Sequence, residues 1–147
     1  KMVYTHMFQR DNFLNPADTG RADQILFELG DPQNSFNWDV SLKHNKLTFG
    51  YSLRYIGKQV LNFYEDVFSK QGRAPENADY ADRTFYPSVY YHDVRVGLDV
   101  NDQFNIYTGV DNLTNRLPPL GLTGTGAGSG IYDVRGRSFY LGVKAKF

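Results

Sequence analysis

The chain has 147 residues, a formal net charge of zero at pH 7 and no cysteine. This composition excludes disulfides and thiolate metal sites, and the balanced charge argues against a nucleic-acid partner. Aromatic residues reach 16% while mean hydropathy is −0.50, and no stretch approaches the roughly 18 consecutive apolar residues of a membrane helix. Transmembrane β-strands remain open as an interpretation, because only every second side chain of such a strand faces lipid.

The first 34 residues predict one strand and one long connection. Residues 1–10 mix aromatic and polar side chains and are expected to form a strand. From Asp11 to Asn34 the chain is rich in turn formers, including Asn15-Pro16 and Gly30-Asp31-Pro32. Ile25 to Leu29 is a candidate short strand inside this connection.

Five later stretches alternate between apolar and polar side chains, which predicts β-strands with one face of each kind. They cover residues 36–43, 47–58, 90–100, 104–111 and 139–147. The apolar sides are Phe36, Trp38, Val40, Leu42; Leu47, Phe49, Tyr51, Leu53, Tyr55; Val94, Val96, Leu98, Val100; Phe104, Ile106, Thr108, Val110; and Phe139, Leu141, Val143, Ala145, Phe147. All charges fall on the opposite sides: Asp39, Lys43, Arg54, Lys58, Asp93, Arg95, Asp99, Asp111, Lys144 and Lys146.

The connections alternate between long and tight. Residues 11–34, 61–85 and 112–132 are long, whereas residues 44–46 and 101–102 are tight turns. Outer-membrane barrels combine short periplasmic turns with longer extracellular loops, and strands of about ten residues match a tilted bilayer crossing. Aromatic residues near the predicted strand ends fit interfacial belts; they are Phe36, Trp38, Tyr86, Tyr90 and Phe147. We therefore expect an all-β antiparallel meander of about six long strands in an outer membrane.

Catalytic and metal-binding motifs are weak. The Gly124–Gly130 run resembles a phosphate-binding loop, but it lacks the Lys-Ser/Thr pair and a following helix, so an extracellular loop is the better interpretation. The histidines lack ligand spacing, and the loop carboxylates have no apolar pocket around them; these residues are His6, His44, His92, Glu65, Asp66, Asp79 and Asp82. The sequence therefore predicts no catalytic residue, cofactor or metal, and no enzyme.

Four segments, read together, resemble the carboxy-terminal part of TonB-dependent outer-membrane receptors. They are YSLRYIGKQVL (51–61), YYHDVRVGLDV (90–100), IYTGVDNLTNRLPP (106–119) and YDVRGRSFYLGVKAKF (132–147). The matching positions are Gly109, Val110, Asn112, Leu113, Pro118, Pro119, Tyr132, Asp133, Gly136, Arg137 and Phe147. Residues 1–50 fit the strand–loop–strand pattern but add little beyond Gly30-Asp31-Pro32.

The resemblance implies that residues 1–147 are the last part of a 22-stranded barrel, with earlier strands and a plug domain encoded upstream. It implies active uptake of a large scarce nutrient, such as a siderophore, cobalamin or oligosaccharide, driven by TonB through the plug. The expected partners are TonB, outer-membrane lipid, the nutrient and the barrel-assembly machinery. The assembly machinery would read Phe139, Leu141, Val143 and Phe147 on the last strand.

Within such a barrel, the charges Asp93/Arg95 and Arg54/Lys58 are expected to contact the plug or one another. Loop aromatics are candidates for stacking on a ligand or for packing within their own loop; they are Phe63, Tyr64, Phe68 and Tyr80. Two alternatives remain open. One is a small passive or adhesive outer-membrane barrel, and the other is a soluble carbohydrate-binding β-sandwich, whose strands also alternate.

Overall fold

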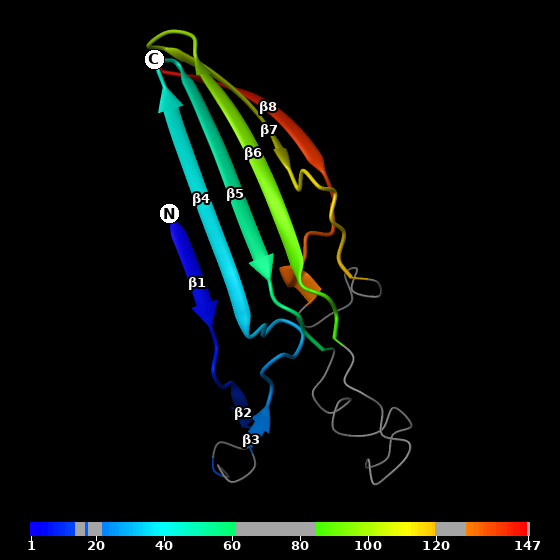
Figure 1. The fold of residues 1–147 in the computed structure, drawn as a ribbon. Coiled ribbons are helices and arrows are strands. Elements are labelled where there is room, and N and C mark those ends of the chain that lie inside the picture. The colour runs from blue at the N-terminus through cyan, green and yellow to red at the C-terminus, as the bar shows by residue number, and fades with distance from the viewer. Residues whose placement is uncertain (14–16, 18–21, 61–84, 120–128, 147) are drawn as a thin grey trace.

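The computed structural model describes residues 1–13, 17, 22–60, 85–119 and 129–146 and confirms the all-β meander (Figure 1). A six-stranded antiparallel sheet runs in the order β1-β4-β5-β6-β7-β8. Its strands are β1 (Met2–His6), β4 (Asn34–His44), β5 (Leu47–Ile56), β6 (Val89–Asp99), β7 (Phe104–Asp111) and β8 (Ser138–Ala145). The sheet is open, with β1 and β8 at its edges. None of the helical turns among the described residues is long and apolar enough to cross a membrane.

The amino-terminal part departs from the sequence prediction. The first strand is only five residues long, and a small hairpin of β2 (Asp11–Phe13) and β3 (Ala22–Gln24) follows it. The short strand expected over Ile25–Leu29 is wrong. That segment turns on itself, because Phe27 takes a positive φ of 75° and its N–H donates to the carbonyl of Asp31. One β-bridge, between Glu28 and Val60, remains there.

Both tight turns lie at one end of the sheet, opposite the long connections (Figure 1). Asn45 turns the β4–β5 hairpin with a φ of 53°, which asparagine tolerates better than most residues. Between β6 and β7, the Asn101 side-chain oxygen accepts the N–H groups of Gln103 and Phe104 at 2.9 and 2.8 Å. Asn45 thus adopts the positive φ that its turn requires, and the Asn101 side chain satisfies two backbone N–H groups of the other turn.

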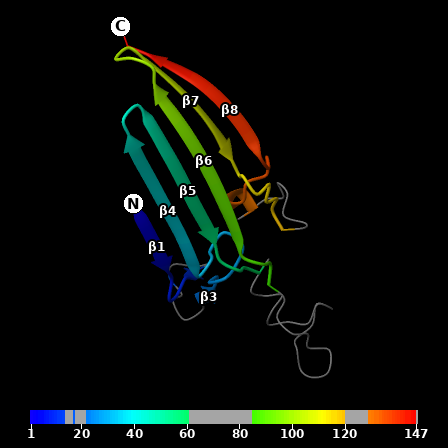
Figure 2. The ribbon, with the colours of Figure 1, turned by 45° about the horizontal axis from the view of Figure 1, so that its top comes forward.

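The strand register gathers all the apolar sides on one face of the sheet. Leu42 pairs with Phe49, which pairs with Val96, and Thr108 continues the row to Leu141. A shift of one residue in any strand would move its apolar set to the other face. The pairing therefore converts five separate alternation patterns into one surface, which follows the bend of the sheet (Figure 2).

The buried core lies away from that surface. It sits on the polar side of the sheet at the long-loop end, where segments 25–32, 59–60 and 131–133 fold back. Its members are Leu26, Leu29, Ile56, Val60, Val89, Tyr91 and Tyr132. Ile56, Val89 and Tyr91 interrupt the polar pattern of their strands because these loops cover them.

Candidate functional site

The apolar face of the six-stranded sheet is exposed. On β8, Phe139, Leu141 and Val143 are 73%, 74% and 64% exposed, and Leu42 and Leu47 at the turn end are more than half exposed as well. Large contiguous apolar surfaces mark contact with a membrane or with another protein. We call this surface, formed by the apolar sides of β1 and β4–β8, the apolar face.

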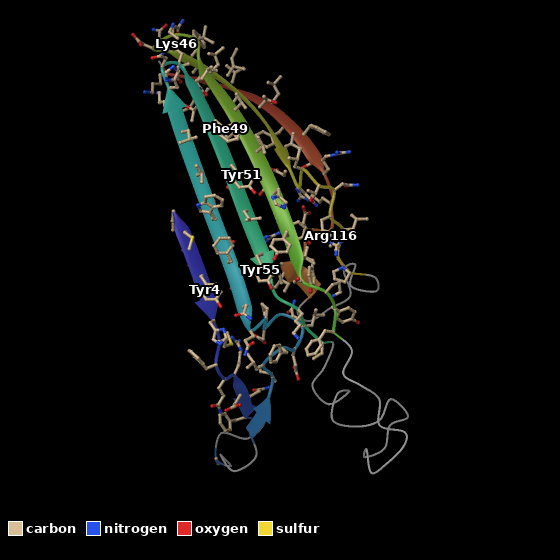
Figure 3. The ribbon with its side chains drawn as sticks, viewed as in Figure 1. Tyr4, Lys46, Phe49, Tyr51, Tyr55 and Arg116 are labelled. Carbon is tan, nitrogen blue, oxygen red and sulfur yellow. The ribbon has the colours of Figure 1, made fainter. Side chains whose placement is uncertain are left out.

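Aromatic side chains form a row across the apolar face near the long loops. Tyr4 pairs with Phe36, Phe36 with Tyr55, and Tyr55 with Tyr90. The rings of Tyr55 and Tyr90 are 4.8 Å apart, and Figure 3 shows Tyr4 and Tyr55 at a similar height on the sheet. Toward the tight turns, which lie at the top of Figure 3, the face becomes mainly aliphatic. The order of an aromatic row beside an aliphatic band is that of a membrane interface.

Polar groups on the apolar face find partners within the sheet. The Tyr51 hydroxyl and Nδ1 of His92 are hydrogen-bonded at 2.8 Å, and the Trp38 ring meets Tyr51 edge-on at 5.9 Å. Thr108 donates its hydroxyl to the carbonyl of Tyr140 at 2.9 Å. His92 lies on the apolar face, opposite Leu53 and on the same side of β6 as Val94. Such internal pairing is what a surface in contact with lipid requires.

The opposite face carries a polar hollow of about 880 Å³. Among the residues that line it are Asp39, Ser41, Thr48, Ser52, Asp93, Arg95, Asp111 and Tyr140. At the turn end, Lys43 forms an ion pair with Asp99 at 2.8 Å. Because β5 lies between β4 and β6, this pair reaches across the middle strand.

Asp93, Arg95, Arg54 and Lys58 each have a partner other than the charge expected to pair with it. Asp93 accepts the N–H of Asn112 at 2.7 Å, and the guanidinium of Arg95 lies 4.7 Å from the Tyr107 ring. Arg54 lies 4.7 Å above the Tyr91 ring, and Lys58 lies 4.3 Å above Phe85. Of the two expectations for these charges, contact with one another is not seen among the described residues, and contact with a plug domain stays a prediction.

Two tyrosines and two glycines interlock on the polar side of β7 and β8. Tyr107 pairs with Gly142, and Gly109 pairs with Tyr140. A Cβ at Gly142 would lie 2.3 Å from Cζ of Tyr107, and one at Gly109 would lie 2.3 Å from the Tyr140 hydroxyl. Each ring thus covers the glycine of the neighbouring strand, which shields the bare backbone and strengthens the pairing.

Asn112 is the centre of a junction at the long-loop end, and its side chain is fully buried. Its Nδ2 donates to the carbonyl of Arg116 at 2.8 Å and to Oδ2 of Asp133 at 3.3 Å, while its Oδ1 accepts the N–H of Arg116. The backbone takes a φ of 51°. One residue therefore joins β6, the segment after β7 and the segment before β8.

A second buried amide, Gln59, joins three other segments. Its Oε1 accepts the N–H of Gly30 at 2.7 Å, its Nε2 donates to the Tyr132 hydroxyl at 2.7 Å, and its backbone bridges to Tyr86. Burial raises the pKa of Tyr132 to about 12, although the hydrogen bond from Gln59 acts in the opposite direction. The phenol of Tyr132 therefore stays neutral in its buried contact with Gln59.

The structure brings most of the family-like positions together. Gly109 and Val110 lie in β7, Pro118 and Pro119 are buried, and Leu113 is exposed. Gly136 has a φ of 71°, and the N–H of Arg137 donates to the Asn115 side chain at 2.9 Å. Residues 112–119 and 131–137 thus form one bonded unit, which we call the junction.

Other predicted residues lie outside the described residues or apart from the junction. Phe147, the loop aromatics, the loop carboxylates and residues 124–128 of the Gly-rich run lie outside the described residues. His6 bonds to Asn34 at 2.7 Å, and His44 lies beside Asn45. Within the described ranges, no group of three metal-ligating side chains is present.

Gln59, Tyr91 and Asn115 were not among the predicted site residues. Nothing around Gln59 indicates burial, since its partners lie far along the chain. Asn115 carried a usable signal, because asparagine is enriched at positive φ and its φ is 52°. The repeated Tyr-x-Gly spacing at 107–109 and 140–142 is a second signal, but it indicates the interlock only when the strand pairing is known.

Comparisons with protein-family models, with curated proteins and with solved structures find no match.

Proposed function

We propose that this chain is the carboxy-terminal barrel segment of an outer-membrane receptor that imports a large, scarce nutrient with energy supplied through TonB. The apolar face supports this proposal most directly. It carries exposed aliphatic side chains on neighbouring strands and an aromatic row at one end, while the charged side chains of the central and carboxy-terminal strands lie on the other face.

The strand dimensions agree with a bilayer crossing. β4 has 11 residues, which at about 3.3 Å per residue span about 36 Å. A tilt of about 40° reduces that length to about 28 Å, close to the apolar band of about 25 Å on outer-membrane barrels. The tight turns would face the periplasm and the long connections the exterior.

In this proposal the edges β1 and β8 pair with further strands of the same barrel, since an unpaired edge in lipid leaves backbone groups unsatisfied. The polar hollow, with Asp93 and Arg95 in its wall, faces the lumen and the plug. Phe139, Leu141 and Val143 face lipid and, with Phe147, are read by the assembly machinery. The chain performs no chemistry; the loops capture the nutrient.

The test is uptake by the full-length protein that contains this chain. We expect it to fractionate with the outer membrane of a Gram-negative host and to import its nutrient only in cells that have TonB. A panel of radiolabelled ferric siderophores, cobalamin and oligosaccharides identifies the nutrient.

Two outcomes would contradict the proposal. Passage of solutes that is equal with and without TonB would indicate a passive barrel. A protein that is monodisperse in buffer without detergent would indicate a soluble β-sandwich.

A further inference from the structure

Three exposed arginines lie on the junction, in the segments that follow β7 and precede β8. They are Arg116, Arg135 and Arg137. Within the part of the chain that the structure describes, the two ion pairs involve other residues, so these guanidinium groups have no carboxylate partner there. The neighbouring acid, Asp133, is occupied, because its oxygens accept the N–H of Arg135 and the amide of Asn112.

The backbones that carry these arginines are held in place. Asn112 Oδ1 accepts the N–H of Arg116 at 2.7 Å, Asp133 Oδ1 accepts that of Arg135 at 3.0 Å, and Asn115 Oδ1 accepts that of Arg137 at 2.9 Å. Because the junction is bonded internally, the main chain that carries the three arginines needs no separate ordering when they bind a ligand.

Exposed aliphatic side chains are interleaved with the arginines. Leu113, Leu117 and Val134 are 43%, 53% and 54% exposed. Exposed cations beside exposed aliphatic groups form the pattern of a surface that lies in a membrane interface. We call these six residues the arginine rim: Leu113, Arg116, Leu117, Val134, Arg135 and Arg137.

The rim continues into the apolar face. The guanidinium carbon of Arg137 lies 5.8 Å from the Phe139 ring centroid, and Phe139 is the first apolar residue of that face on β8. Figure 3 shows Arg116 beside the loop-side end of β8. The cations thus lie at the level where the apolar band of β8 ends.

A hollow of about 800 Å³ adjoins the rim. Arg116 lines it with two polar neighbours, Thr114 and Asn115, and with the mainly apolar side chains of Tyr86, Pro87, Leu117, Pro118 and Pro119. One cation among mainly apolar walls suits an anionic group that carries a hydrocarbon portion better than it suits a free anion.

We propose that the arginine rim binds the phosphate of membrane-lipid headgroups at the outer boundary of the apolar band. Guanidinium groups bind phosphate through paired hydrogen bonds, and the aliphatic members of the rim contact the glycerol and the first carbons of the acyl chains. The inference rests on the proposed function, because it requires the apolar face to lie in a bilayer.

The test uses the full-length protein in nanodiscs of phosphatidylcholine, with or without added phosphatidic acid. We expect phosphatidic acid to raise the midpoint of thermal unfolding by about 2–4 °C. The variant R116Q/R135Q/R137Q should unfold at the wild-type midpoint in phosphatidylcholine alone and lose the rise. The matched control K144Q/K146Q removes two cations from the opposite end of β8 and should keep it.

A second variant, R116K/R135K/R137K, keeps the charge and should retain part of the rise, which guards against a triple glutamine variant that does not fold. A wild-type protein without the rise, or a glutamine variant that keeps it, would overturn the inference. An equal rise with soluble glycerol 3-phosphate would indicate a free-anion site instead.

Failure of the proposed function gives a different result. A protein that does not enter nanodiscs contradicts the membrane proposal itself. Uptake that does not depend on TonB, together with an intact response to phosphatidic acid, contradicts the transport proposal and leaves the rim in place.

Discussion

Tyr140 occupies the space that a side chain at Gly109 would need. The two residues pair across the β7–β8 ladder, and a Cβ at Gly109 would also lie 2.8 Å from the backbone carbonyl of Val94 on β6. The ring can swing aside, but the carbonyl belongs to the sheet and cannot. Gly109 therefore leaves room for the Tyr140 ring beside the backbone of β6 and β7.

Gly109→Ala should destabilise the full-length protein by about 1–3 kcal/mol, the usual cost of forcing extra volume into a packed site. Unfolding by guanidinium in detergent micelles measures it. Gly50→Ala is the matched control, since its nearest neighbour would be 3.6 Å away. If both substitutions had the same effect, the cost would come from strand propensity and not from the interlock.

Leu141→Arg tests which face meets lipid. Leu141 is 74% exposed, so in water the change should alter stability by no more than about 0.5 kcal/mol. In a bilayer it should cost about 2–4 kcal/mol near the midplane. Folding titrations into lipid vesicles measure the difference, with Lys144→Gln on the polar side as the milder control. If Leu141→Arg left the stability in vesicles unchanged, the assignment of the lipid-facing side would be wrong.

Asn112 combines two roles that substitution can separate. Asn112→Gly removes the side-chain hydrogen bonds to Arg116 and Asp133 but tolerates the φ of 51°; we expect a loss of about 1–3 kcal/mol. Asn112→Ala should lose about 1 kcal/mol more, because alanine is strained at positive φ. Thermal unfolding of both variants provides the comparison. Equal losses would mean that the backbone relaxes out of this conformation.

Tyr132 should make the junction sensitive to alkali. Its pKa rises from 10.0 in the unfolded chain to about 12 in the folded state, so the folded state holds the proton more tightly. The resulting stability is fully present below pH 10 and is lost as the pH rises toward 12. The difference in unfolding midpoint between wild type and Tyr132→Phe should narrow across that window. A constant difference from pH 9 to about 12 would mean that the phenol is not protected by burial.

The alternation of side chains determined most of the sheet. In β4, β5, β6, β7 and β8, one face was apolar throughout most of its length, and a period of two leaves little choice of orientation for such a strand. Asparagine-rich turns marked the two tight connections. These signals are local, and they predicted both ends of β7, Phe104 and Asp111, correctly.

Local signals failed where backbone contacts came from distant segments. Ile25–Leu29 has the composition of a strand, yet hydrogen bonds to Asp31 and Val60 fold it into a turn. Ile56, Val89 and Tyr91 are apolar residues at positions of the polar face. Their place is explained by the loops that fold back and bury them. No pattern in the sequence near Gln59 predicts that its side chain forms hydrogen bonds with Gly30 and Tyr132.

The sequence by itself determined that this chain forms antiparallel strands with one apolar and one polar side, because the pleat imposes that geometry on each strand independently. Only the tertiary structure decided that the apolar sides make one exposed face while the buried core forms on the opposite side. That decision depends on strand register and on contacts between residues far apart in the chain. Similar contacts bring the segment of Arg116 beside that of Arg135 and Arg137, which follows it by about twenty residues in the chain.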